Sequence, residues 1–231
     1  MIKTKVYEIV TSIITNRMHL HPIKTGRIAE NLYAIKTGTV NSFIYKENRN
    51  PICIDTGFGK SIVSREIHSL GIDSNDVTHL FLTHSDIDHT DGLPIFEKAE
   101  VYLSFDEERL ITRQKARMLG LIYNPKINRS YHLLKDNDIV SVGSTKIQAI
   151  STPGHTVGSM SYLINETILF VGDTFKLIDN KVYPKKSYIN MNTEQQKTSI
   201  QKLAWLDHIN LAFTAHNGYT QEFDKAISSW K

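Results

Sequence analysis

The stretch FLTHSDIDHTDG, residues 81–92, places two histidines and three aspartates within eight positions, directly behind a short apolar run. Surface loops often contain aspartate, but they rarely gather histidine and aspartate this densely. Imidazole and carboxylate groups are the usual protein ligands of zinc, manganese and iron. The preceding run HLFLT, residues 79–83, is typical of a strand. The cluster would therefore lie at the carboxyl end of that strand, where α/β proteins often place their sites.

Four residues of this stretch can bind a metal: His84, Asp86, Asp88 and His89. Four ligands within six positions cannot all reach one ion without strain, so they suit two neighbouring ions better. Further ligands are then needed elsewhere, and three residues occur in a similar context, beside glycine at the end of a strand-like run. These are His155 in STPGHT, Asp173 in FVGDTF and His216 in FTAHNG.

In this order and spacing, the segments THSDIDH, PGHT, GDT and AHNG resemble the metallo-β-lactamase-fold (glyoxalase II-like) hydrolases. The signature of that family is HxHxDH, followed by single histidine, aspartate and histidine ligands. VNSFIY and CIDTG also resemble its opening strands. The resemblance runs from about residue 31 to residue 218, and it implies a four-layer αββα fold. Two mixed β-sheets flanked by helices are expected, in a single domain over residues 1–231.

The resemblance also implies roles for individual residues. His84 and His155 would hold a first divalent ion, and Asp86 stands where the family usually has a second histidine. Asp173 would bridge this ion to a second one. Asp55 would lie behind the ligands and orient one of them or the bound water. The second ion would be held by Asp88, His89 and His216.

The function implied by this resemblance is hydrolysis of a small-molecule ester, thioester, lactone or phosphodiester by a hydroxide that bridges two metal ions. The ions would be zinc, with manganese or iron as alternatives. Asp88 is the candidate catalytic residue, because it could orient the hydroxide while it binds a metal. Two other functions stay open. One is a diiron oxidoreductase or oxygen sensor similar to the flavodiiron proteins, which carry glutamate at the position of Asp86, and the other is a metal-binding protein without turnover.

Asp86 is the departure from the family pattern that bears on the choice of metal. A third aspartate among the ligands adds a negative charge, which weakens the pull of the metal ions on the bound water and raises its pKa. Oxygen ligands also favour manganese and iron over zinc. We therefore expect these two ions to support activity at least as well as zinc does.

The composition limits the other functions. The chain has 231 residues with 27 basic and 24 acidic side chains, and a net charge of +3 is too balanced to indicate nucleic-acid binding. No stretch approaches 18 apolar residues, so no membrane span is expected. The N-terminus does not resemble a secretory signal, and the only cysteine, Cys53, cannot form an internal disulfide. These features favour a cytoplasmic protein, with Cys53 as a small buried residue.

Short runs rich in β-branched and aromatic residues predict strands, and apolar residues at helical spacing predict helices between them. A tight turn at Asn165–Glu166 predicts a hairpin, and Thr193 with Gln196 forms a predicted capping box. The predicted strands are Lys5–Ile14, Asn31–Ile35, Val40–Tyr45, Ile52–Asp55, His79–Thr83, Glu100–Ser104, Lys146–Ser151, Ser159–Ile164, Thr167–Val171 and Ile209–Thr214. The predicted helices are Lys60–Leu70, Phe105–Leu119, Thr193–Leu206 and Gln221–Trp230.

Other polar residues receive different interpretations. Asp91 is interpreted as a residue at a helix N-terminus rather than as a further ligand. Two segments are candidate walls of the pocket: Met118–Tyr131, and the stretch behind Asp173 that carries Lys176, Lys181, Lys185, Lys186, Tyr183 and Tyr188. The histidines outside strand-end contexts are interpreted as structural or exposed: His19, His21, His68, His79, His132 and His208.

Overall fold

The computed structural model describes residues 20–46, 50–117 and 120–231. The expected strand Lys5–Ile14 and His19 lie outside the described residues, as do Met118 and Leu119 of the second candidate wall segment. Among the described residues, no helix is long and apolar enough to span a membrane.

The first sheet has seven strands in the order β1-β2-β3-β4-β5-β6-β7. Strands β1 to β4 pair antiparallel, whereas β4 to β7 run parallel to one another. The strands are β1 (Gly26–Ala29), β2 (Leu32–Thr37), β3 (Val40–Tyr45), β4 (Ile52–Ile54), β5 (His79–Phe81), β6 (Glu100–Ser104) and β7 (His132–Leu134).

The second sheet has six strands in the order β15-β14-β11-β10-β9-β8, and only β11 and β14 pair in parallel. A separate two-stranded sheet follows β11. The strands are β8 (Ile139–Val142), β9 (Thr145–Ser151), β10 (Met160–Ile164), β11 (Ile168–Phe170), β14 (Leu211–Phe213) and β15 (Tyr219–Thr220), with β12 (Lys176–Ile178) and β13 (Lys181–Tyr183) in the small sheet.

The two large sheets pack face to face through aromatic side chains. Phe43 of β3 lies with its ring centroid 5.2 Å from that of Phe170 of β11 and 5.0 Å from that of Phe213 of β14. All three rings are buried, as is Tyr162 of β10. Complete burial of such a side chain stabilises a fold by about 1.5–3 kcal/mol. The inner faces of the sheets therefore form the main hydrophobic core.

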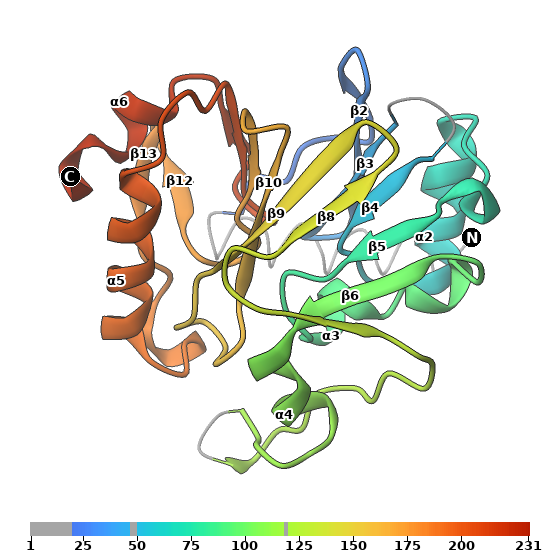
Figure 1. Cartoon of the computed structure of the whole chain (residues 1–231), viewed down its shortest axis with the longest axis horizontal. Coiled ribbons are helices and arrows are strands. Elements are labelled where there is room, and N and C mark those ends of the chain that lie inside the picture. Colours follow the sequence, from blue (N-terminus) through green and yellow to red (C-terminus); the bar gives the residue numbers. More distant parts are fainter. Residues whose placement is uncertain (1–19, 47–49, 118–119) are drawn as a thin grey trace, which may run out of the picture.

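Helices cover the outer face of each sheet (Figure 1). Helix α2 (Lys60–Ser69) packs Val63 and Ile67, which are one helical turn apart, against the first sheet. Helices α5 (Thr193–Ala204) and α6 (Phe223–Ile227) cover the second sheet and bury Ile200, Leu203 and Phe223. Together, the four layers form the αββα arrangement that the sequence predicts.

Most predicted elements within the described residues are present. Val40–Tyr45 and Glu100–Ser104 are strands with the predicted bounds. The hairpin between β10 and β11 is also confirmed, because Asn165 and Glu166 adopt φ angles of 46° and 61°. Positive φ angles at both central residues are typical of the type I′ turn, whose twist matches that of a two-stranded ribbon. Cys53 is fully buried, as expected.

Two helical predictions are wrong in detail. In the predicted helix 105–119, the described residues 105–117 contain only a 3-10 turn and the short helix α4 (Glu108–Ile111), because Arg113 takes a left-handed φ of 62° that ends the helix. The cap of α5 is Asn192 rather than Thr193, and its Oδ1 accepts a hydrogen bond of 3.0 Å from the Gln195 N–H. The short strands missed by the sequence analysis are β1, β7, β8, β12, β13 and β15.

Candidate metal centre

The candidate ligands come together because the strands that precede them end at one edge of the molecule. In the second sheet, β9, β11 and β14 run in the same direction, so their carboxyl ends lie side by side. The loop after β5 of the first sheet faces the same edge and continues into the single helical turn α3 (Ile87–Thr90). Both sheets therefore supply ligands to one place. The seven side chains brought together are His84, Asp86, Asp88, His89, His155, Asp173 and His216.

The first ligand set consists of His84, Asp86 and His155, whose candidate donor atoms all lie within 4.8 Å of one another. Asp86 Oδ2 is 3.6 Å from His84 Nε2 and 3.2 Å from His155 Nε2. Both histidines are buried, whereas the Asp86 side chain is 22% exposed. Burial raises the pKa of Asp86, but the neighbouring imidazoles of His155 and His84 lower it more, so the carboxyl has a pKa well below its ordinary value.

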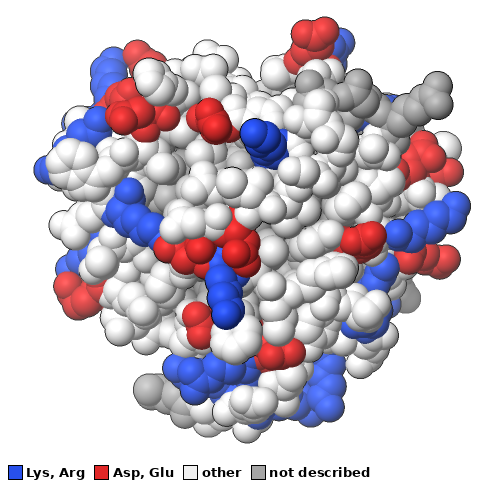
Figure 2. All heavy atoms as spheres, viewed as in Figure 1, with Lys and Arg blue, Asp and Glu red and all other residues white. Residues whose placement is uncertain are grey.

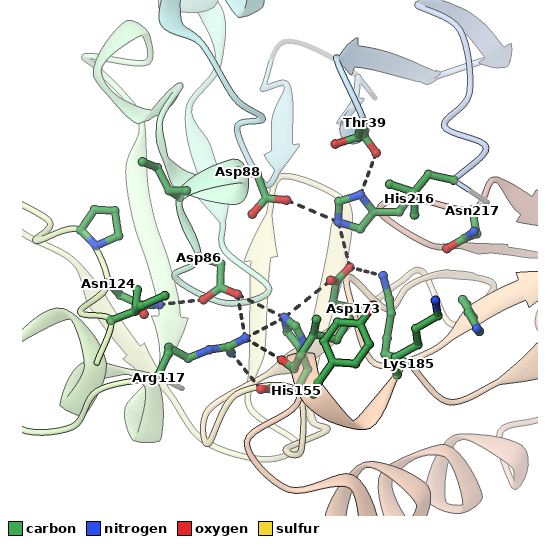
Figure 3. A pocket seen from close by; sticks show the side chains of 18 of the residues that line it. Thr39, Asp86, Asp88, Arg117, Asn124, His155, Asp173, Lys185, His216 and Asn217 are labelled. Carbon is green, nitrogen blue, oxygen red and sulfur yellow. Dashed lines mark hydrogen bonds and ion pairs between the residues drawn. The ribbon is translucent and has the colours of Figure 1, made fainter. Parts of the chain in front are cut away.

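The second ligand set consists of Asp88, His89 and His216, whose donor atoms also lie within 4.8 Å of one another. Asp88 Oδ2 is 3.7 Å from His89 Nε2 and 3.4 Å from His216 Nε2. The ring of His216 is oriented by its Nδ1 atom, which donates a hydrogen bond of 2.7 Å to the Thr39 carbonyl (Figure 3). Its Nε2 therefore faces the ligands.

Asp173 lies between the two ligand sets. Its Oδ2 is 3.6 Å from His155 Nε2, and its Oδ1 is 3.3 Å from His216 Nε2. The ammonium group of Lys185 is 2.9 Å from Oδ1, and both side chains are buried (Figure 3). Burial raises the pKa of Asp173, but the charges of His216 and Lys185 hold it well below its ordinary value. One carboxylate thus reaches both ligand sets.

The cluster has the properties of a cation site. The Nε2 atoms of His84 and His89 are buried and have no hydrogen-bond partner among the described residues. Buried polar atoms without a partner are rare and costly in folded proteins. Burial alone would lower the pKa of His89, but the carboxylates of Asp55 and Asp88 raise it to about 10. The carboxylates that favour a positive charge on His89 would also favour a metal ion, so the residues fit a divalent cation.

Asp55 orients two of the histidines from behind. Its Oδ2 accepts hydrogen bonds of 2.8 Å from His89 Nδ1 and 2.7 Å from Thr83 Oγ1. The Thr83 hydroxyl in turn lies 3.1 Å from His84 Nδ1. Because this arrangement places the protons on the Nδ1 atoms, the Nε2 lone pairs of both rings point into the cluster. Asp55 itself has a left-handed φ of 55°, which places its side chain beneath the ligands.

Glycine is required before His155. Gly154 has a φ of 138°, and a Cβ atom at this position would overlap the backbone and side chain of Gln196 in α5. The loop after β9 therefore lies directly against α5. Gln196 also accepts a hydrogen bond of 3.1 Å from the Lys185 N–H and donates one of 3.2 Å to the Asp173 carbonyl. This glutamine, which the sequence analysis placed in a capping box, instead joins two loops of the centre.

Four residues contact the candidate ligands or their loops, and the sequence did not predict these contacts. Glu107 is fully buried and joins the loop of the first ligand set to the loop after β9. Arg117 and Asn124 both contact Asp86, and Lys185 contacts Asp173 (Figure 3). Asn124 and Lys185 both lie in segments predicted as candidate walls of the pocket. The pairing of Lys185 with Asp173 gave no signal in the sequence.

Other expectations have mixed outcomes. Asp91 is at the C-terminal end of α3 rather than at a helix N-terminus, because α3 is only one turn long. Its Oδ2 accepts a hydrogen bond of 2.9 Å from the Gly59 N–H. The histidines that were interpreted as structural or exposed, and that are described, lie outside the candidate ligand groups: His21, His68, His79, His132 and His208.

A cavity of about 610 Å³ opens over the ligands. Both candidate wall segments contribute to it, Ile122 and Tyr123 from one and Lys186 and Tyr188 from the other. Lys181 and Tyr183 do not line it. On the face shown in Figure 2, basic and acidic side chains are interspersed rather than gathered into a patch of one sign.

Comparison with known proteins identifies the family. The family model described as the metallo-beta-lactamase superfamily matches residues 35–229. Among solved structures, a subclass B3 metallo-beta-lactamase of Bradyrhizobium japonicum superposes with a TM-score of 0.69 at 19% identity, covering 87% of this chain and 81% of that one. A B3 metallo-beta-lactamase with an active-site glutamic acid gives a TM-score of 0.72 at 18% identity, covering 95% and 90%. These structures confirm the predicted fold.

Curated relatives are similar over part of their length. A Bacillus subtilis protein named a probable polyketide biosynthesis zinc-dependent hydrolase is 32% identical over 158 residues, which are 67% of this chain and 60% of the relative. An atrochrysone carboxyl ACP thioesterase of Pseudocercospora fijiensis is 30% identical over 138 residues, 58% of this chain and 36% of the relative. The matched region thus spans less than two thirds of either relative.

Proposed function

We propose, on the premise that the chain belongs to the metallo-beta-lactamase superfamily, that it is a hydrolase with two divalent metal ions and a small-molecule substrate. The scissile group would be an ester, thioester, lactone or phosphodiester, and the thioesterase and hydrolase names of the relatives favour an acyl ester or thioester. The observation that carries the proposal is the pair of partnerless Nε2 atoms of His84 and His89, which face into a cluster of carboxylates and imidazoles.

Each ligand set would hold one ion. The first set would use His84, Asp86 and His155, and the second would use Asp88, His89 and His216. Asp173 would contribute one oxygen to each ion, since its two oxygens face different sets. Asp55 would fix the orientation of His84 and His89, as its hydrogen bonds indicate.

Bound divalent ions would supply a water molecule that is activated at neutral pH and would polarise the scissile bond. Residues of the chain would orient the water and stabilise the charge that develops on the substrate. Asp88, which lies at the cavity with its side chain 34% exposed, would orient the attacking water and accept its proton. The buried ammonium of Lys185 also lines the cavity and would face negative charge that develops on the substrate oxygen.

The cavity favours a substrate with both an apolar and an anionic part. Ile122 and Tyr123 on one side and Tyr188 on the other are each about half exposed and offer apolar surface. Two exposed cations accompany these rings. Arg113 lies 5.9 Å from the centre of the Tyr123 ring, and the Lys186 ammonium lies 5.9 Å from that of Tyr188.

Removal of divalent ions with a chelator is expected to abolish hydrolysis, and zinc is expected to restore it. Elemental analysis should find two equivalents of metal per chain. The expectation that manganese or iron serve at least as well rests on the added charge of Asp86 and on its oxygen ligation. Arg117, whose Nη2 is 3.0 Å from Asp86 Oδ2, would offset the charge and leave only the second argument.

The substrate test is a screen of ester, thioester, lactone and phosphodiester compounds with the zinc-loaded protein. Release of product from at least one class is expected, and acyl thioesters should be the best substrates. A protein that binds metal but hydrolyses none of them would contradict the proposal. Oxygen consumption without hydrolysis would instead favour the diiron redox alternative.

Replacing Lys186 by glutamate is expected to raise the KM for an anionic acyl substrate several-fold, with a smaller change in kcat. Lys186 is exposed at the rim of the cavity, so charge reversal would repel the anion before it reaches the ligands. Lys181→Glu is the matched control, because Lys181 is an exposed residue of the same segment that does not line the cavity. Equal effects of both substitutions would argue against binding at this rim.

A further inference from the structure

Arg117 is buried beside the first ligand set, although it belongs to a segment far from any of the ligands in the sequence. Its side chain is 8% exposed, and it lies next to Asp86 on the wall of the cavity (Figure 3). The Arg117 backbone is also fixed, because its carbonyl accepts hydrogen bonds of 3.1 Å from Gly120 N and 3.2 Å from Leu121 N. The guanidinium is therefore held in one place.

The guanidinium makes four contacts, and each involves the first ligand set or the adjacent loop. Its Nη1 donates a hydrogen bond of 2.8 Å to the His155 carbonyl, and its Nη2 donates one of 2.9 Å to the Ile189 carbonyl. Nη2 also lies 3.0 Å from Asp86 Oδ2 and 3.4 Å from His155 Nε2. Only a planar fork with several donors can reach two carbonyls and a carboxylate at once.

The Asp86 carboxylate is oriented so that only Oδ2 contacts Arg117. Its Oδ1 accepts a hydrogen bond of 3.0 Å from Asn124 Nδ2, which leaves Oδ2 facing His84, His155 and Arg117. The same oxygen is the one that could bind a metal. Arg117 and the first ion would therefore share one carboxylate oxygen.

The opposite charges of Arg117 and Asp86 indicate the role of their contact. Asp86 stands where similar proteins usually have a histidine, which is neutral when it binds a metal. A carboxylate at this position makes the ligand set more negative by one charge, and a buried guanidinium beside it restores the balance. Coulomb interactions are strong at such short distances in a buried site, so the compensation should influence how tightly the ion is held.

We propose that Arg117 neutralises the charge of Asp86. The two side chains together would then have a net charge of zero toward the first ion, as a single neutral imidazole has. This inference rests on the proposed function, because it assumes that the first ligand set binds a divalent ion. It makes Arg117 a positioning and charge-balancing residue of the metal centre rather than a catalytic one. It also predicts that residues 86 and 117 cannot be changed independently.

The test is a double-substitution cycle, read out by zinc affinity in a competition titration against a chromophoric chelator. The variants are Asp86→His, Arg117→Gln and the two combined. Asp86→His alone leaves an unpaired cation beside the ion. We therefore expect this substitution to weaken zinc binding at the first ligand set at least about tenfold. Adding Arg117→Gln removes that cation and should restore most of the lost affinity.

Arg117→Lys separates charge from shape in the same background. Lysine keeps the positive charge but cannot form the planar fork, so Asp86→His with Arg117→Lys should stay as weak as Asp86→His alone. Arg109→Gln is the matched control, because Arg109 is exposed and lies in the same stretch of chain. Combined with Asp86→His, it should restore nothing. Circular dichroism of each variant verifies folding, and zinc titration of the folded variants gives the comparison.

Three outcomes would contradict the inference. If Arg117→Gln weakened zinc binding by the same factor with aspartate and with histidine at position 86, Arg117 would act only by holding its loop. If the wild-type protein bound one ion and Arg117→Gln bound two, the guanidinium would occupy an ion's place. This outcome would overturn the inference and would also reduce the proposed two-ion centre to one ion. Failure of the wild-type protein to bind zinc at all would overturn the whole proposed function, whereas the first outcome would overturn the inference alone.

Discussion

Replacement of Asp173 by asparagine is expected to reduce kcat/KM by more than about a hundredfold and to lower the zinc content of the purified protein. Loss of a residue that only orients a metal ligand typically costs about 10–100-fold in affinity or activity. Asp173 should cost more, because its two oxygens face both ligand sets. The substitution keeps the shape of the side chain but removes the negative charge shared between the sets.

The same substitution leaves Lys185 without its charged partner in a buried position, where an unpaired cation is costly. We therefore expect a lower melting temperature as well as a lower metal content. Asp207→Asn is the matched control, since Asp207 is exposed and remote from the ligand sets. Full zinc content and normal kcat/KM in Asp173→Asn would show that this carboxylate does not connect two ions.

Glu107→Gln is expected to lower the free energy of unfolding by about 2–4 kcal/mol, because it leaves buried donors without acceptors. Glu107 Oε1 accepts hydrogen bonds from the Ser85 N–H at 2.8 Å and the Ser85 hydroxyl at 2.6 Å. Its Oε2 accepts from the Thr156 hydroxyl at 2.6 Å and the Gly158 N–H at 3.1 Å. A glutamine amide would turn an NH2 group toward one of these donor pairs.

Urea unfolding measures the change in stability of Glu107→Gln directly. Activity should fall too, since Ser85 lies between two ligands in the sequence and Thr156 follows His155. Glu97→Gln is the control, because it makes the same chemical change at an exposed position. A loss below about 0.5 kcal/mol, which is usual for a surface substitution, would show that Glu107 does not join the two loops.

Local sequence patterns were sufficient to predict which side chains come together, because each candidate ligand lies at or shortly after the end of a strand. His155, Asp173 and His216 each follow a short apolar run and lie near a glycine, and the parallel strands bring these ends together. The layers were predictable for a similar reason. Apolar residues that recur every second position in a strand, or about every 3.6 positions in a helix, lie on one face that must be buried. Val63 and Ile67 form such a face of α2.

The supporting residues could not be predicted in the same way, because their partners are distant in the sequence. Glu107 lies in FDEERL and Arg117 in QKARM, and both stretches have the charge density of a solvated helix. Only tertiary contacts bring Glu107 to Thr156 and Arg117 to Asp86. The short strands were missed because runs such as KLI and KVY, in β12 and β13, alternate exposed and buried residues over only three positions.

The supply of ligands from both sheets has a consequence for the order of events during synthesis. The loop after β5 leaves the ribosome well before the last candidate ligand, His216, which follows β14. Domains assemble as their chain emerges, and contacts between distant segments form late. A nascent chain that ends before residue 216 therefore presents histidines and aspartates without a complete binding site. On the proposed function, metal capture is therefore expected to be one of the last steps of maturation, after residue 216 has emerged.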